Sequence, residues 1–500
     1  MSRSRIISVV LVALSILLAA PAVWGILGVD DGLIETSNEV DGVPVMLITP
    51  DGEASGLPGV VVVHGFAASS TIMEPLGRML ARAGYAVALP DVSGHGANSS
   101  SLSVDDTSRD ELQVDVAAVL SWLGAQPAVD ADRLALVGHS MGAGAVTRYS
   151  IDNPDAVQAT VAISLPSSIE PVGIPRALLL LYGSAEPAGF ATAAQEQFDA
   201  LKAADPAADV VMEIIPGVEH ISVVWSPSTA EATLGWIGSA VDGPTAPVDL
   251  DPAWLWLILL LLAGCLFAVP LARWLFGPVR SEPEARVAGW VGIVLTFAAA
   301  VVASLVASFL GGAAESLIPV AVGGYLAVWF AVAAAVIGIG MLVVRRYRRR
   351  SFGPPNPRAI AATLGMTAFA VLLLILSARV TWATAAFVGP RWWVWIVLSL
   401  VLLGYFYADA VLVARASLGG RIGVLVANRL IITIVLFVSV LWLGAPSILT
   451  LLLPIMVLLF LLLGYLALII TWRVPGRFGP ALVQAVPLAA IVASGFPLIG

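Results

Sequence analysis

The sequence contains little cysteine and little charge, and both shortages limit what the protein can be. Cys265 is its single cysteine, so neither an intrachain disulfide nor a cysteine-based metal site can form. Charged residues make up 12% of the 500 residues and hydrophobic residues 59%, with a mean hydropathy of +0.94. These values lie far outside the range of soluble domains, so most of the chain is expected in lipid.

The few charges are divided unevenly along the chain. Residues 29–252 contain 30 acidic and 7 basic side chains, whereas residues 253–500 contain 4 and 16. The acidic part is therefore a poor partner for nucleic acid or for anionic lipid head groups. All four histidines fall in it, namely His64, His95, His139 and His220. Any side-chain chemistry is expected there.

The first 28 residues form an apolar segment behind a basic start. Arg3 and Arg5 precede the run 6–27, which is long enough to span a bilayer as a helix. Ala20-Pro21-Ala22 also resembles a signal-peptidase site, so the segment is either a retained signal anchor or a cleaved signal peptide. Under both interpretations the basic flank stays inside and the next segment is exported.

Residues 29–242 alternate short apolar runs with longer helical patterns, which predicts an α/β domain with a mostly parallel sheet. The predicted strands are 43–48, 59–63, 86–89, 134–137, 159–164, 177–182 and 210–215. The predicted helices are 73–83, 108–123, 142–149, 191–203 and 229–241. Residues 243–252, with three prolines, are predicted to be a linker.

One motif within this domain indicates nucleophilic chemistry. Residues 137–142 read Val-Gly-His-Ser-Met-Gly, a G-x-S-x-G pattern between a predicted strand and a predicted helix. In such an elbow the glycines permit a sharp backbone turn that raises the serine hydroxyl above the sheet edge. Ser140 is therefore the candidate nucleophile.

Four segments in order resemble the α/β-hydrolase family over residues 40 to 240. They are His64-Gly65-Phe66, the loop from Asp91 to Gly96, the elbow around Ser140, and Pro216-Gly217-Val218-Glu219-His220. The resemblance implies an α/β-hydrolase fold, a mostly parallel sheet flanked by helices. It also implies a catalytic triad whose members follow in the order serine, acid, histidine.

The resemblance assigns the remaining catalytic roles. His220 matches the catalytic base, and Glu186, in Gly183-Ser184-Ala185-Glu186, stands where the family more often has aspartate. Glu219 and Asp209 are the alternative acids. The family pattern also implies an oxyanion hole made by the backbone N–H groups of Phe66 and Met141.

The other three histidines and the loops around the predicted site are expected to have structural roles. His64 and His139 are expected to shape their turns, and His95, despite lying near Asp91, is not expected to act as a catalyst or metal ligand. Residues 165–175 leave no room for a lid domain between two strands. We therefore expect an open site lined by Phe66, with Trp225 near His220.

Residues 253–500 are predicted to form a membrane domain of about eight transmembrane helices. The apolar segments are 253–272, 287–310, 317–344, 359–378, 392–414, 422–443, 447–472 and 480–499. With the first segment these make nine spans. If the spans cross the membrane alternately from a cytoplasmic N-terminus, 15 arginines fall on the cytoplasmic side. Only Arg379 and Arg391 fall on the outer side. This asymmetry supports a multi-pass plasma-membrane protein with an extracytoplasmic hydrolase domain.

Two charges within the predicted spans lie at similar depth. Asp409 and Arg429 sit six and eight residues from the same membrane face and could pair across a helical hairpin. The pair is either structural or part of a proton or ion pathway.

The leading functional hypothesis is a membrane-anchored extracytoplasmic serine hydrolase, acting as an esterase, thioesterase or peptidase through Ser140, His220 and Glu186. Its expected partners are a small-molecule or lipid-like acyl substrate and the bilayer, without cofactor, metal or nucleic acid. One alternative is an acyltransferase that uses the same triad. Another is a transporter or signalling protein whose hydrolase-like domain binds a ligand.

Overall fold

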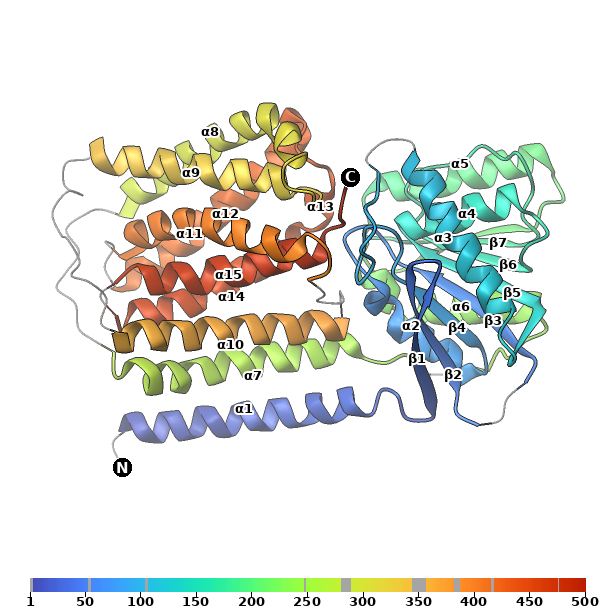
Figure 1. Ribbon diagram of the computed structural model, residues 1–500, viewed down its shortest axis with the longest axis horizontal. Coiled ribbons are helices and arrows are strands. Elements are labelled where there is room, and N and C mark those ends of the chain that lie inside the picture. The colour runs from blue at the N-terminus through green and yellow to red at the C-terminus, as the bar shows by residue number, and fades with distance from the viewer. Residues whose placement is uncertain are drawn as a thin grey trace. The chain divides into compact units, whose positions relative to one another are not determined.

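The computed structural model describes residues 3–52, 55–103, 107–246, 249–279, 289–343, 357–381, 387–414, 418–474 and 476–500. It divides into two compact units (Figure 1). The sheet unit comprises residues 21–258, 378–388 and 494–500, and the helical unit comprises 1–20, 259–377 and 389–493. Several arginines predicted in inner loops lie outside the described residues, namely Arg280, Arg286, the Arg345 to Arg350 cluster and Arg415.

The sheet unit is built on an eight-stranded, mostly parallel sheet, which confirms the predicted α/β fold. Its strands lie in the order β1-β2-β4-β3-β5-β6-β7-β8. Only the β1–β2 and β2–β4 pairs are antiparallel. The strands are β1 (Leu33–Val40), β2 (Val43–Pro50), β3 (Leu57–Val63), β4 (Ala86–Pro90), β5 (Val129–His139), β6 (Ala159–Ile163), β7 (Leu178–Gly183) and β8 (Val210–Ile215). Strand β1 was not predicted, because this half-exposed edge strand is mostly polar and has no clear apolar alternation.

Helices cover both faces of the sheet (Figure 1). Val60 and Val62 pack with α2 and α6, whereas Val61 and Val63 pack with α3 and α4, because successive strand residues point to opposite faces. Helix α5 joins α4 against β7 on the second face. The helices are α2 (Ser70–Ala83), α3 (Thr107–Gly124), α4 (Met141–Asp152), α5 (Ala188–Ala204), α6 (Pro227–Ala240) and the short 3-10 helix η1 (Ser222–Trp225).

The parallel strands determine where the predicted site residues meet. Strands β3, β5, β7 and β8 are followed by the loops and turns that contain Phe66, Ser140, Glu186 and His220. The carboxyl ends of parallel strands lie at one sheet edge. Residues distant in sequence therefore converge there.

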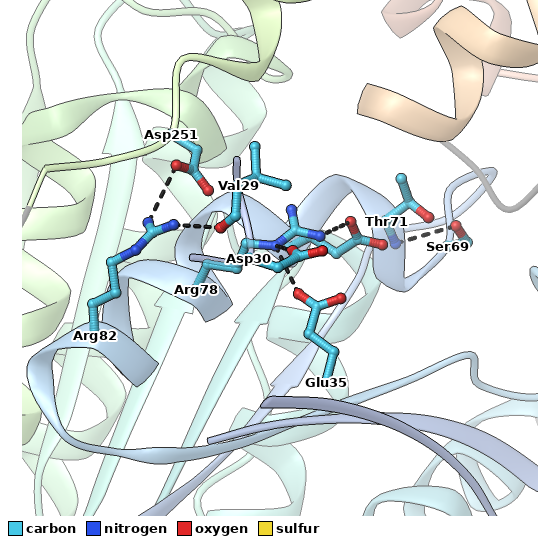
Figure 2. Close-up of polar contacts among 9 residues, drawn as sticks. Val29, Asp30, Glu35, Ser69, Thr71, Arg78, Arg82 and Asp251 are labelled. Atoms are coloured by element: carbon cyan, nitrogen blue, oxygen red, sulfur yellow. Dashed lines mark hydrogen bonds and ion pairs between the residues drawn. The ribbon is translucent and has the colours of Figure 1, made fainter. Parts of the chain in front are cut away.

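Two arginines of α2 join that helix to both ends of the sheet unit's main segment (Figure 2). The Arg78 guanidinium lies 3.0 Å from Glu74, 2.8 Å from Glu35 and 3.0 Å from Asp30. Arg82 pairs with Asp251 at 3.2 Å and donates to the carbonyl of Val29. The segment that follows α1 (Arg3–Leu27) and the segment that precedes α7 (Ala253–Phe276) are thus both held by α2.

The helical unit contains long apolar helices, as predicted. Among the described residues, eight helices, α1 included, are long and apolar enough to cross a membrane. A further apolar helix, residues 455–471, is shorter. The predicted segment 447–472 appears as α13 and α14. The helices are α1 (Arg3–Leu27), α7 (Ala253–Phe276), α8 (Gly289–Glu315), α9 (Gly323–Val343), α10 (Pro357–Thr381), α11 (Arg391–Ala414), α12 (Leu418–Leu443), α13 (Ile448–Leu451), α14 (Leu453–Thr471) and α15 (Phe478–Gly495).

Asp409 and Arg429 pair inside the helical unit. Their side chains lie 2.7 Å apart and each is 2% exposed. Asn428 donates to the other Asp409 oxygen at 2.8 Å, and Arg429 also donates to Gln484 at 2.7 Å. The buried charges thus have polar partners, as a structural link between α11, α12 and α15 requires.

Candidate active site

The elbow around Ser140 has a backbone that its glycines make possible. Ser140 lies between β5 and α4 with φ 54° and ψ −116°, a conformation rare for a residue with a side chain. A Cβ on Gly138 would lie 2.2 Å from the carbonyl oxygen of Gly142, and one on Gly142 would lie 2.4 Å from that of Val63. Both positions therefore require glycine.

The hydroxyl of Ser140 meets the imidazole of His220. The Ser140 Oγ to His220 Nε2 distance is 3.1 Å. Phe190, on α5, stacks on the His220 ring with centroids 4.3 Å apart, and the His139 ring lies 4.8 Å away. His139 Nε2–H also donates to the His220 carbonyl at 2.9 Å. These contacts fix the imidazole opposite the hydroxyl.

Glu186 lies behind His220. Its Oε2 is 3.7 Å from His220 Nδ1, which is within ion-pair range but too long for a hydrogen bond. The other carboxylate oxygen accepts a 2.5 Å hydrogen bond from Ser164 Oγ. A Cβ on Gly183 would lie 2.4 Å from the Val218 carbonyl oxygen, so the loops after β7 and β8 pack closely. The His220 imidazole thus has the Ser140 hydroxyl near its Nε2 and the Glu186 carboxylate near its Nδ1.

The two alternative acids have other surroundings. Glu219 accepts hydrogen bonds from the backbone N–H groups of Ile221 at 3.0 Å and Ser222 at 2.7 Å, so both its oxygens serve the start of η1. Asp209 is exposed and directly precedes β8, away from the carboxyl edge. Geometry therefore favours Glu186 as the acid.

The backbone groups expected in the oxyanion hole adjoin Ser140. Met141 is the first residue of α4, where an N–H has no acceptor within the helix. Phe66 follows Gly65, at which a Cβ would lie 3.2 Å from Ser140 Cβ. Both donors therefore belong to segments in contact with the hydroxyl-bearing residue.

His64 and Asp91 organise the neighbouring loops. His64 Nδ1–H donates to the Gly65 carbonyl at 2.8 Å and its Nε2 accepts from the Val92 N–H at 3.3 Å. Complete burial lowers the pKa of His64, which favours the neutral ring that this pattern needs. Asp91 accepts from the N–H groups of Ser70 at 2.8 Å and Ala97 at 2.7 Å.

His95 makes contacts within the same group of loops. His95 Nδ1–H donates to the Ser93 carbonyl at 2.9 Å, and the buried ring packs against Phe66 and His64. In the part of the chain that the structure describes, no group of three or more histidine, cysteine or acidic residues is arranged to hold a metal ion.

The fold and the site can be compared with known proteins. The family model described as alpha/beta hydrolase fold matches residues 58–207. The chain carries an α/β-hydrolase domain. The matched segment includes Ser140 and Glu186 and ends before His220, so the placement of His220 depends on its contacts.

Three curated proteins resemble parts of this chain. An sn-1-specific diacylglycerol lipase of Mus musculus is 34% identical over 124 residues, which cover 25% of this chain and 36% of the lipase. Epoxide hydrolase A of Mycobacterium tuberculosis is 31% identical over 132 residues, with coverages of 26% and 39%. A thermostable monoacylglycerol lipase of a Bacillus species is 32% identical over 120 residues, with coverages of 23% and 44%. The chain thus spans less than half the length of each relative.

The surroundings of the α/β-hydrolase site follow the predicted outline in part. No helix or strand lies between β6 and β7, where the sequence analysis expects no lid domain. Trp225 donates its indole N–H to the Ile72 carbonyl at 3.3 Å and packs against the core.

Ser164 and Phe190 contact Glu186 and His220 but were not predicted as site residues. Ser164 directly follows β6 at the carboxyl edge of the sheet. Polar residues at this edge are frequent site residues in α/β proteins, and this signal could have identified Ser164. Phe190 carries no comparable signal, because an apolar residue near a helix start is typical of ordinary core packing.

Proposed function

We propose that this chain is a membrane-anchored serine hydrolase that cleaves carboxylic esters outside the cytoplasm. The observation that carries the proposal is the 3.1 Å contact between Ser140 Oγ and His220 Nε2 at a strained elbow, with Glu186 behind the imidazole. A nucleophile, a base and an orienting acid in this arrangement form the site of a serine hydrolase.

The proposed reaction proceeds through an acyl-enzyme. Ser140 Oγ attacks the acyl carbonyl carbon while His220 Nε2 takes the hydroxyl proton, and Glu186 stabilises the resulting imidazolium. The N–H groups of Phe66 and Met141 donate to the oxyanion. Collapse expels the alcohol, which takes the proton from His220, and water then releases the acid by the same steps in reverse.

An acyl lipid or a related ester is the favoured substrate class. Two of the relatives are named as acylglycerol lipases. Epoxide opening, named for the third relative, suits this site poorly, because attack by a serine hydroxyl would give a stable ether. A carboxylate nucleophile would instead give an ester that water can cleave, and position 140 is serine.

Fluorophosphonate labelling of the full chain tests the proposal, together with hydrolysis of p-nitrophenyl acyl esters. We expect labelling of the wild type, and Ser140→Ala should lose the label and more than about 10⁴-fold of turnover. Ser239→Ala, which changes an exposed serine on α6, serves as the matched control. Undiminished labelling and turnover in Ser140→Ala would refute the assignment.

A further inference from the structure

Residues 496–500, which follow the last helix, form part of the sheet unit. Leu498 donates its N–H to the Gly94 carbonyl at 2.7 Å and accepts from the Leu102 N–H at 2.8 Å. The Gly500 N–H donates to the Leu102 carbonyl at 3.3 Å, and Ile499 pairs with Leu102 in a parallel bridge. We call residues 496–500 the strap.

Residues 496–498 of the strap are buried, and Leu498 binds the loop of residues 93–102 through Gly94 and Leu102. Leu498 is 1% exposed, Phe496 8% and Leu102 5%. A Cβ on Gly94 would lie 2.7 Å from the Leu498 carbonyl oxygen. Gly94 also has φ 79°, so this position suits glycine both for its backbone conformation and for the close approach of the strap.

The loop that the strap holds leads to the proposed oxyanion hole. His95 follows Gly94, and its ring lies against Phe66 with centroids 5.6 Å apart. His95 Nδ1–H also bonds to the Ser93 carbonyl at 2.9 Å, and the Ser93 N–H donates to Asp115 at 2.7 Å. Phe66 carries one of the two proposed oxyanion donors. The contacts thus run from Leu498 through Gly94 and His95 to Phe66.

We propose that the strap is a positioning element for catalysis: by holding the loop of residues 93–102, it keeps His95 against Phe66 and the Phe66 N–H aimed at the oxyanion. The proposal rests on the proposed hydrolase function. It makes turnover in the sheet unit depend on a segment that follows α15, the last of the described apolar helices. A donor displaced by a fraction of an ångström stabilises the transition state less and affects substrate binding little.

Two disruptive variants and one control, all made in the full-length protein, test the strap. Leu498→Pro removes the N–H that bonds to Gly94, whereas Leu498→Met keeps that N–H and nearly the same volume and serves as its matched control. Deletion of residues 496–500 removes all the contacts. We expect Leu498→Pro and the deletion to lower kcat for a p-nitrophenyl ester by about 10- to 100-fold, with KM changed less than about threefold. Leu498→Met should behave as the wild type.

Two further measurements distinguish a positioning role of the strap from a general loss of folding: rescue of kcat by an added peptide, and amide hydrogen exchange. The peptide Phe-Pro-Leu-Ile-Gly, added to the deletion variant, should restore kcat, and the same peptide with proline in place of leucine should not. Amide exchange in residues 92–103 should speed up in Leu498→Pro and in the deletion. Equal kcat in the wild type and the deletion variant would overturn the proposal, as would a loss that follows the unfolded fraction and resists rescue. A wild type without labelling or turnover would instead refute the hydrolase function itself.

Discussion

At the scale of single residues, the site depends on how one carboxylate is held. Glu186 is almost fully buried, and Ser164 engages one of its oxygens, so the other faces His220. Substrate binding would need to shorten the 3.7 Å separation by about 0.5 Å or more to form a hydrogen bond. Catalytic hydrogen bonds are often long before substrate is bound.

Replacement of the acid gives a sharp prediction. Glu186→Gln should keep the fold but lower kcat by about 10³-fold or more, because an amide can hold the imidazole in the wrong tautomer. Glu219→Gln is the matched control, since that carboxylate caps η1 and should affect stability more than turnover. Steady-state kinetics and thermal melting separate the two effects. Large kinetic loss in Glu219→Gln with little in Glu186→Gln would transfer the role to Glu219.

At the scale of elements, α2 links the site to the sheet unit's ends. The N–H of Ser70, its first residue, donates to Asp91. Arg78 and Arg82 bind the segments next to α1 and α7 (Figure 2). Arg78 faces Glu74, Glu35 and Asp30, so three carboxylates share one cation. Burial outweighs the attraction of Arg78 and raises the pKa of Glu74 to about 7.

This raised pKa predicts a pH-dependent stability. Since the folded-state pKa of Glu74 lies above its ordinary value of 4.5, the folded state binds the proton more tightly. The stabilisation is complete below pH 4.5 and is lost as pH rises toward 7, by up to roughly 3 kcal/mol. In melts of the full chain between pH 5 and 8, Tm of the wild type should fall relative to that of Glu74→Gln. Glu231→Gln, at an exposed position on α6, is the control. A Tm difference that is constant or rises with pH would contradict the prediction.

At the scale of the whole molecule, the chain segments that make up the sheet unit agree with the proposed membrane topology. Residues 21–258, 378–388 and 494–500 belong to it, and all three ranges fall outside the cytoplasm when nine segments alternate from a cytoplasmic start. The strap lies on the extracytoplasmic side only if the shorter helix α14 also crosses the membrane. This agreement supports the sidedness that the arginine distribution suggests.

Cysteine labelling in intact cells tests this topology. In a Cys265→Ser background, cysteines at the exposed Ser100 and appended after Gly500 should react with a membrane-impermeant maleimide. A cysteine at Ser351, which lies outside the described residues, should react only after permeabilisation. The opposite pattern would overturn the proposed sidedness. Protection of the appended cysteine alone would place α14 within one leaflet or within the protein.

Local signals in the sequence predicted most of the strands and the candidate chemistry. Alternating apolar runs placed seven of the eight strands, and the glycines around Ser140 marked the elbow, because periodicity and backbone freedom act over a few residues. The order of Ser140, Glu186 and His220 along the chain indicated a triad through family resemblance. Depth along two apolar helices was enough to predict the Asp409–Arg429 pair.

Only the tertiary structure decided which distant groups touch. Nothing local to Ser164 or Phe190 marks them as supports for Glu186 and His220, and nothing in Phe496 to Gly500 indicates a place beside Gly94. Such contacts depend on strand order and on the path of the chain through the helical unit. The sequence by itself therefore determined the fold class and the candidate chemistry. The packing of remote segments decided how the candidate catalytic groups are held, because that packing is a property of the whole fold.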